Sequence, residues 1–413
     1  MPAIVARLNP FRTGEARRLA LLFAIVYFAQ GMWSLPNQTI TMIFKDGGMS
    51  PGQVANFFAI SGAPWLLKPV YGLLSDFVPL FGRRRTGYFV LSSGLAALAG
   101  FGAAFGGGTS YWTLVVLFTA MGLGLAFTDV MTDALMVESG RPRGLTGAFQ
   151  SVQWAAIYGA AIVVGLGGGY LAEHRSLKAT FLVAACFPLV SLVMAVLFIR
   201  EPRAQADWNA LRERGRAVRL AVASRNVWLV AGFIFFWTFS PSFGPAFLFY
   251  QVDQLKFGQQ FIGTLAALAS IGSVAGALVY APLSRTMSLR RAINLSIGLG
   301  ALSTVIYLFY RDPVSAVIIA ITYGILYMLT TLAFLDLAAK ACPRHVEATF
   351  FALLMSVFNL GQQASQWTGS HLYDLVGFRN LVLIAAAMTA LTWVLVPFVD
   401  IDRIEAAARE PST

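Results

Sequence analysis

The chain has 413 residues, of which 57% are hydrophobic and only 12% are charged, and its formal net charge is +11. Soluble proteins usually carry about 25% charged residues, so this composition could not cover the surface of an aqueous globule. It excludes a soluble enzyme, a disordered chain and a nucleic-acid-binding domain, and it predicts an all-α polytopic membrane protein.

Apolar stretches of about 20 residues, each long enough to cross a bilayer, recur along the whole chain. They predict twelve transmembrane helices, over residues 18–44, 53–79, 87–106, 112–138, 147–172, 179–199, 227–252, 259–283, 291–310, 313–339, 347–373 and 380–399. The first stretch follows Arg17 and Arg18, but it is too long for the apolar part of a signal peptide, so we expect a membrane helix there.

Basic residues gather on one side of the predicted membrane. Of the 30 basic residues in the chain, 23 lie on the same side of the membrane as the N-terminus. They are found before the first span, after the even-numbered spans and in the tail, and Lys340 lies at a helix end on that side. The positive-inside rule therefore predicts an integral protein of the cell (inner) membrane with both termini in the cytoplasm. A basic stretch between the sixth and seventh spans is better explained as a connector facing lipid head groups than as a nucleic-acid site.

This stretch divides the chain in two. We expect an N-terminal six-helix bundle (1–199), a linker (200–226) with a surface helix in ERGRAVRL, a C-terminal six-helix bundle (227–400) and a cytoplasmic tail (401–413). The halves are weakly similar, because Asp133 precedes Thr146 by the same thirteen residues that separate Asp336 from Thr349. A parallel repeat of six spans with both termini inside is the major facilitator architecture.

Three ionisable residues lie at membrane depth, where charged groups are costly and by default suggest function. Lys68 lies in the second span, and Asp129 and Asp133 lie four residues apart in the fourth, on one helix face. We expect Lys68 to meet Asp129, Asp133 or both. Such a pair could simply satisfy itself, or its lysine could be shared between an anionic substrate and a carboxylate that takes up a proton.

Uncharged polar residues at similar depth could line a cavity or hold helices together through hydrogen bonds. The set comprises Gln30, Gln150, Gln153, Thr330, Thr331, Asn359, Gln362, Gln363 and Gln366, with Trp154 and Trp367 beside it. Amides next to aromatic walls suit a flat ligand rich in heteroatoms. The run FIFFWTFSPSFGPAFLFY, residues 233–250, contains two prolines and predicts a broken helix that faces this cavity.

The loop after the second span reads GLLSDFVPLFGRRR and combines Asp76 with Arg83, Arg84 and Arg85. The arginines could serve only as positive-inside anchors. Asp76 has an obvious arginine partner nearby, and a salt bridge that closes the two halves on the cytoplasmic side would be a natural gate.

No pattern typical of an enzyme or a metal site is found. Cys186 and Cys342 are too few for a disulfide framework or a zinc site, and the three histidines have no metal-ligand spacing. None of the five lysines completes a phosphate-binding loop. We therefore expect no catalytic residue, no metal and no cofactor.

Four segments match a known family. WLLKPVYGLLSDFVPLFGRRRTGYFVL (65–91), DVMTDALMVE (129–138), FGQQFIGTLAALASIGSVAGALVY (257–280) and ACPRHVEATFFALLMSVFNLG (341–361) resemble the folate–biopterin transporter family of the major facilitator superfamily. The last is close to that family's CPxxVEATxFALLMSxxNL signature, although SQWTGSHLY (365–373) departs from its usual form. Muropeptide permeases share a similar FGRRR loop but lack this signature.

The resemblance implies a twelve-helix symporter for pterins or folates, and it places Lys68, Asp129 and Asp133 on the family's charged membrane positions. We expect a monomeric, proton-coupled carrier in the lipid bilayer that moves a pterin- or folate-like anion by rocking of its halves. The expected substrate-binding residues are Lys68, Gln30, Gln153, Trp154, Asn359, Gln363 and Trp367, with Asp129 or Asp133 carrying the proton and Asp76, Arg83, Arg84 and Arg85 acting as the gate. The alternatives are a muropeptide or other small-solute carrier of the same fold, and a non-transporting assembly or cofactor-delivery factor.

Overall fold

The computed structural model describes residues 11–106, 110–143, 145–199, 201, 203, 225–342 and 347–409. The described part of the chain is helical apart from its turns and one isolated bridge between Leu80 and Arg83. The first half contains α2 (Gly14–Gly31), η1 (Met32–Ser34), α3 (Pro36–Asp46), α4 (Pro51–Gly62), η2 (Ala63–Leu67), α5 (Lys68–Phe77), α6 (Thr86–Phe105), α7 (Tyr111–Gly140), η3 (Arg141–Arg143), α8 (Thr146–Glu173) and α9 (Leu177–Phe198). The second half contains α11 (Arg225–Thr238), α12 (Gly244–Asp253), α13 (Gln259–Thr286), α14 (Leu289–Val305), η4 (Ile306–Phe309), α15 (Pro313–Lys340), α16 (Glu347–Leu391), η5 (Thr392–Phe398) and α17 (Ile401–Arg409).

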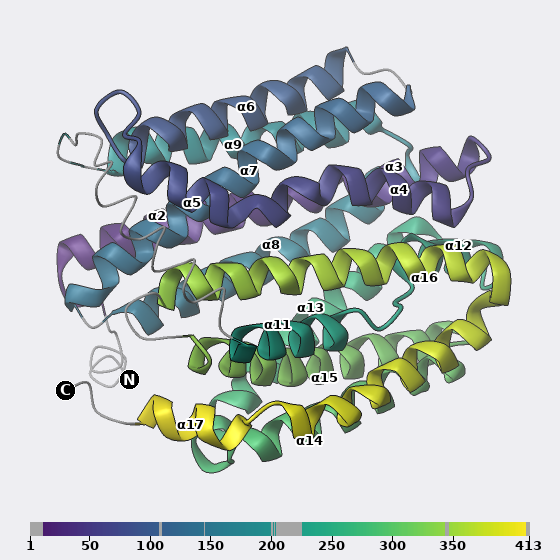
Figure 1. Cartoon of the computed structure of the whole chain (residues 1–413). Coiled ribbons are helices and arrows are strands. Elements are labelled where there is room, and N and C mark those ends of the chain that lie inside the picture. The colour runs from purple at the N-terminus through teal and green to yellow at the C-terminus, as the bar shows by residue number, and fades with distance from the viewer. Residues whose placement is uncertain are drawn as a thin grey trace, which may run out of the picture.

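Ten helical stretches in the described residues are long and apolar enough to cross a membrane. Together with the shorter apolar helix α11, they overlap each of the ranges expected for the twelve spans, and α12 forms the second part of the seventh. The last stretch, 350–398, covers two expected spans, because α16 bends at Gly377, where φ is +73°. Figure 1 shows the chain turning back there, on the right of the view. Most of the linker, including its expected surface helix, and residues 343–346 of the family signature lie outside the described residues.

The expected break in the seventh span is confirmed. α11 ends at Thr238 and α12 begins at Gly244, with Pro241 between them. Pro241 lacks a backbone N–H and its ring crowds the preceding helical turn, which favours an interruption here. The freed backbone is satisfied by α16, because Ser242 N donates to the Ser365 hydroxyl at 3.0 Å and that hydroxyl donates to Ser240 O. An interrupted helix is tolerated at membrane depth when neighbouring helices satisfy its backbone in this way.

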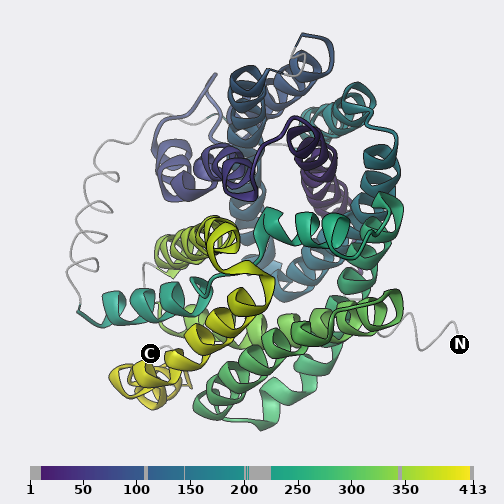
Figure 2. The same cartoon turned by 90° about the vertical axis from the view of Figure 1, so that its right-hand side faces the viewer.

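The two halves form two bundles that lie side by side. In Figure 2 the first half, purple to blue, occupies the upper part of the molecule, and the second, green to yellow, occupies the lower part. Each bundle has its own apolar core, around residues such as Phe23 and Phe118 in the first and Phe233 and Phe334 in the second. The expected bounds of the two bundles (1–199 and 227–400), of the linker (200–226) and of the tail (401–413) stay predictions.

The helices α8 and α13 join the halves through small residues. Gly165 and Gly169 of α8 face Gly263 and Ala267 of α13, and a Cβ added at Gly263 would lie 2.1 Å from Gly165 O. Small residues spaced four apart on both helices let the backbones approach closely, which favours van der Waals packing in a bilayer.

The internal repeat extends to contacts that the sequence did not reveal. Glu201, which follows α9, accepts hydrogen bonds from the backbone N–H groups of Arg85 and Thr86 at the start of α6. In the second half Glu405 of α17 accepts one from Leu289 N, at the start of α14, at 3.0 Å. A carboxylate at a helix N-terminus satisfies free N–H groups and complements the helix dipole. The same device therefore anchors the third span of each bundle.

Candidate functional site

The ionisable residues expected at membrane depth come together in the first half. Lys68 begins α5 and its Nζ lies 2.5 Å from Asp129 Oδ2 of α7. The lysine side chain is 17% exposed and the aspartate side chain is 3% exposed, so the pair is largely removed from solvent. Lys68 Nζ also lies over the ring of Trp65, 4.9 Å from its centroid, within the range of a cation–π contact.

Asp133 has different neighbours from Asp129, although both lie on the same face of α7. Its Oδ1 accepts hydrogen bonds from the hydroxyl of Tyr27 in α2 and from Gln153 Nε2 of α8, the latter at 3.3 Å. Asp129 therefore has an ammonium partner, whereas the hydrogen-bond donors to Asp133 among the described residues are uncharged. The sequence could not decide which carboxylate meets Lys68, because both face the same side.

A chamber of about 450 Å³ lies between the two halves, beside Trp65. Its lining includes the expected Asn359 and Gln363 from α16, together with Trp33, Trp65 and Asn37 from the first half. Gln363 Nε2 donates to Gly62 O at 3.0 Å and so links α16 to α4. The indole nitrogens of Trp33 and Trp65 and the amide oxygen of Asn37 are buried and have no hydrogen-bond partner among the described residues. Buried polar atoms without a partner are costly, which favours a ligand or water as their missing partner.

The other expected binding residues lie outside the lining of this chamber. The Gln30 amide oxygen is buried without a partner among the described residues, and Gln153 contacts Asp133. Trp154 is 39% exposed and stacks on Tyr158, and Trp367 is 42% exposed and donates to Asn56 Oδ1 at 2.6 Å.

Two tryptophans that sequence reasoning missed, Trp33 and Trp65, line this chamber. Trp65 stands three residues before Lys68, and that helical spacing could have identified it. Trp33 gives no comparable signal, because the chain brings it to Trp65 only through the packing of the first span against the second; the two rings lie 5.4 Å apart.

A second chamber, of about 550 Å³, lies within the second half, beside the break between α11 and α12. Residues of α14, α15 and α16 complete it, among them the expected polar residues Thr330, Thr331 and Gln362. Both volumes fall in the range of about 300–1,000 Å³ typical of small-molecule sites.

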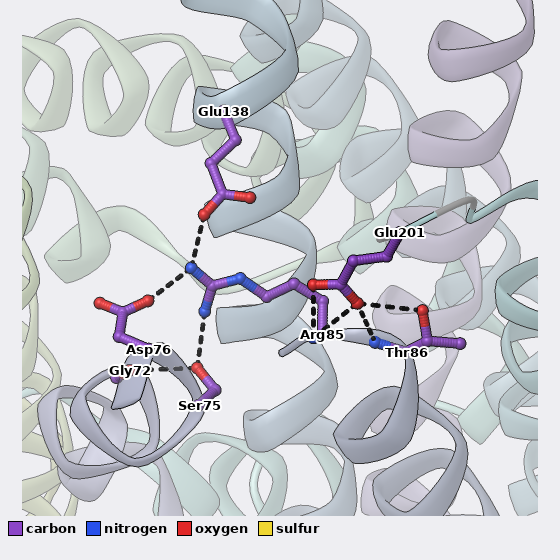
Figure 3. Close-up of polar contacts among 7 residues, drawn as sticks. All are labelled: Gly72, Ser75, Asp76, Arg85, Thr86, Glu138 and Glu201. Carbon is purple, nitrogen blue, oxygen red and sulfur yellow. Dashed lines mark hydrogen bonds and ion pairs between the residues drawn. The ribbon is translucent and has the colours of Figure 1, made fainter. Parts of the chain in front are cut away.

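Arg85 is the centre of a polar cluster at the end of the first bundle that carries the arginine-rich loop (Figure 3). Its Nη2 contacts Asp76 at 2.5 Å and Glu138 at 2.7 Å, and its Nη1 donates to the Ser75 hydroxyl at 2.6 Å. Burial alone would lower the pKa of the Arg85 guanidinium, but Asp76 and Glu138 raise that pKa above its usual value, so the group stays charged.

The described contacts of Arg85 lie within the first half. Asp76, Glu138 and Glu201, which contact Arg85 or its backbone, all precede the second bundle in the chain. The Asp76–Arg85 salt bridge therefore ties helices of the first half together, and the gating role expected for Asp76, Arg83, Arg84 and Arg85 stays a prediction. Arg83 and Arg84 are exposed. The turn at Phe81 and Gly82, both with positive φ, folds the loop back. Arg85 therefore points at α5 and α7, where its partners Asp76 and Glu138 lie.

The described polar contacts between the halves gather at the opposite end of the molecule, on the right of Figure 1, and near its middle. Lys45 at the end of α3 pairs with Asp253 at the end of α12 at 2.6 Å. Glu173, the last residue of α8, accepts hydrogen bonds from the N–H of Gln259 at 2.7 Å and of Gln260 at 3.3 Å. We call these five residues the outer contacts, since they lie away from the arginine-rich loops.

Comparisons with known proteins agree with this architecture. The model of the BT1 family matches residues 28–399. The chain is 33% identical over 402 residues to the "Folate-biopterin transporter" of Synechocystis sp., covering 91% of this chain and 80% of that protein. It is 24% identical to the "Probable folate-biopterin transporter 4" of Arabidopsis thaliana, covering 91% of this chain and 94% of that one.

Solved structures of major facilitator transporters share the fold. A POT family transporter in complex with 5-aminolevulinic acid superposes with a TM-score of 0.72 at 14% identity, over 93% of this chain and 97% of that one. The xylose transporter XylE from E. coli, in its inward open conformation, gives 0.71 at 12% identity, over 94% and 98%. Because the family model matches most of this chain, the chain belongs to the BT1 family, and it is a membrane transporter with the major facilitator fold rather than an enzyme.

Proposed function

We propose that this protein is a proton-coupled carrier for a pterin- or folate-like organic anion and works by alternating access in the cell (inner) membrane. The observation that carries the proposal is the buried Lys68–Asp129 pair, which adjoins Trp65 and through it the chamber between the halves. The names of the Synechocystis and Arabidopsis relatives, both folate-biopterin transporters, support the substrate class.

Lys68 provides the positive charge that an anionic substrate needs at membrane depth. The carboxylate of Asp129 and the ring face of Trp65 both contact the Lys68 ammonium. They compensate its charge while no substrate is bound. A substrate carboxylate that enters the chamber competes with Asp129 for this ammonium. When the ammonium turns to the substrate, the two neighbouring carboxylates of α7 lose the cation that offsets their charge, and in low dielectric this favours uptake of one proton by the pair. Substrate binding and proton uptake thereby become linked.

Asp133 is the residue that we assign to proton coupling. Its hydrogen-bond donors, Tyr27 and Gln153, come from α2 and α8, so the carboxyl group stays in one position when its charge changes. It lies one helical turn from Asp129, which lets a change of charge at one carboxylate be felt by the other. Asp129 then acts as the counter-ion of Lys68, and Asp133 carries the proton.

The chamber between the halves supplies the contacts for a flat heteroaromatic ring. The indole N–H groups of Trp33 and Trp65 can donate to ring nitrogen or oxygen atoms, and the side-chain amides of Asn359 and Gln363 can both donate and accept. Aromatic side chains also offer faces for stacking, which adds roughly 0.5–1.5 kcal/mol beyond the area buried.

Alternating access requires the outer contacts to break and re-form. The two bundles rock about the α8–α13 interface, and the present arrangement is the state in which the outer end is closed by Lys45, Asp253 and Glu173. The basic loops face the cytoplasm on this proposal, with both termini on the same side.

The test is uptake of labelled folate and biopterin by proteoliposomes that contain wild-type protein or the Lys68→Ala variant. Losing one charged hydrogen-bond partner is worth about 1.5–3 kcal/mol, so we expect the affinity for a folate anion to fall by roughly tenfold to a hundredfold. Lys178→Ala, which removes an exposed lysine, is the matched control and should transport normally. Normal uptake by Lys68→Ala at equal expression would refute the role of Lys68, and competition by a sugar–peptide instead of pterins would favour a muropeptide-type carrier.

A further inference from the structure

The chamber within the second half is chemically different from the charged site in the first half. None of its described lining residues carries a charge, and most are aromatic or hydroxyl-bearing. More than half of the described lining residues bear a hydroxyl group, among them Tyr307, Tyr323 and Tyr327. A site of this kind can hydrogen-bond a polar, uncharged group, but it cannot neutralise an anion.

Aromatic rings form one wall of this chamber. Tyr323 packs edge-on against Tyr307 at 5.3 Å and stacks with Tyr327 at 5.8 Å, so three tyrosines follow one another along it. The Tyr327 hydroxyl accepts a hydrogen bond from Gln362 Nε2 at 3.0 Å. The hydroxyl oxygen of Tyr327 therefore accepts from Gln362, and its O–H proton is left to be donated. A hydrogen-bond acceptor on a ligand in the chamber can receive that proton.

The two chambers share part of their lining and are therefore adjacent. Gly244, Phe247, Gln362 and Gln366 line both of them. Gly244 has φ +46°, and a Cβ there would lie 2.9 Å from Gln366 O, so glycine keeps the backbone close at this junction. Gln362, which lines both chambers, can contact a ligand in either of them.

The internal repeat lets the charged residues of the first half be compared with the corresponding positions of the second half. At the repeat offset of 203 positions, Asp336 corresponds to Asp133, but Asp129 corresponds to Leu332 and Lys68 corresponds to Ile271. The second half therefore lacks the equivalent of the buried ion pair and has the hydroxyl-lined chamber instead.

We infer that the chamber of the second half is the subsite for the uncharged, hydrogen-bonding end of the substrate, while its anionic end lies toward Lys68. This inference rests on the proposed function and adds the orientation of the substrate. It assigns Tyr327 and Gln362 to the neutral heterocycle or its hydroxylated side chain, and Lys68 to the carboxylate.

The experiment separates the two ends of the ligand by measuring Kd for purified protein in detergent. The probes are biopterin, which has an uncharged ring with a hydroxylated side chain, p-aminobenzoylglutamate, which carries only the anionic end, and folate, which has both. Tyr327→Phe removes one hydroxyl and keeps the ring, Lys68→Gln removes the charge, and Tyr170→Phe, at a tyrosine that lines neither chamber, is the matched control.

We expect Tyr327→Phe to weaken biopterin and folate by about fivefold, the effect of one hydrogen bond, and to leave p-aminobenzoylglutamate unchanged. Lys68→Gln should show the reverse selectivity, weakening folate and p-aminobenzoylglutamate but not biopterin. If Tyr327→Phe weakens only p-aminobenzoylglutamate, or no probe at all, while wild-type protein binds folate, the orientation is overturned and the transporter proposal stands. If wild-type protein binds none of the probes, the proposed function itself fails, and this inference fails with it.

Discussion

Replacing Arg85 by alanine tests whether its cluster holds the first bundle together. The guanidinium makes three side-chain contacts, to Asp76, Glu138 and Ser75, at 2.5–2.7 Å, and the arginine side chain is only 6% exposed. Hydrogen bonds to charged groups contribute about 1.5–3 kcal/mol each when they are fully buried. The side chains of Asp76 and Glu138 are 30% and 52% exposed, so water regains access to them and reduces the loss. We therefore expect Arg85→Ala to lower the free energy of unfolding by about 2–4 kcal/mol.

The matched control is Arg84→Ala, which removes the same charge from the neighbouring exposed position. A thermal-unfolding assay of the purified protein in detergent should show a clear drop in the apparent Tm for Arg85→Ala and almost none for Arg84→Ala. Arg85→Lys keeps the charge but replaces the planar fork of two terminal nitrogens by a single nitrogen, so its Tm should lie between those of wild type and Arg85→Ala. Equal Tm values for Arg84→Ala and Arg85→Ala would show that only net positive charge matters and would refute the argument from geometry.

Three further predictions concern the transport cycle. Asp133→Asn should bind substrate and exchange it across the membrane but should lose accumulation driven by a proton gradient, and proteoliposomes that still accumulate substrate would contradict this. Gly263→Val should destabilise the closed state of the outer end by roughly 1–3 kcal/mol, because the added side chain meets Gly165 O. Spin labels at that end should report longer distances in this variant, and an unchanged distance distribution would count against the prediction. Lys45→Ala should leave the Tm nearly unchanged, since its pair with Asp253 is partly exposed and worth at most about 1 kcal/mol, and should shift the same distance distribution toward the open outer end; a large drop in Tm would show that the pair is structural.

Much of the fold could be predicted from the sequence because its determinants are local. The length and apolar composition of a stretch determine whether it can cross a bilayer, and each of the twelve expected ranges contains helix in the described residues. The break after Thr238 was likewise predictable, since Pro241 removes a backbone donor and disfavours the preceding helical turn. The ion pair between the second and fourth spans could be expected because a lone buried charge is too costly to leave without a partner.

The partners within the site could not be predicted, because they depend on how each helix is rotated about its axis and packed against its neighbours. Sequence alone left Asp129 and Asp133 equivalent as partners of Lys68, and it favoured Trp154 and Trp367 as the aromatic walls. Packing pairs Lys68 with Asp129 and brings Trp33 to Trp65 from another helix.

The sequence by itself determined the membrane class, the two-bundle repeat and the residue types at membrane depth, because transfer free energies act residue by residue. Only the tertiary structure decided that Asp76 binds Arg85 within one bundle, that Glu201 and Glu405 secure equivalent helices, and that an uncharged chamber opens in the second half. The physical reason is that a contact between distant segments needs a specific rotation, depth and spacing of two helices, and the packing of the whole bundle sets these three quantities together.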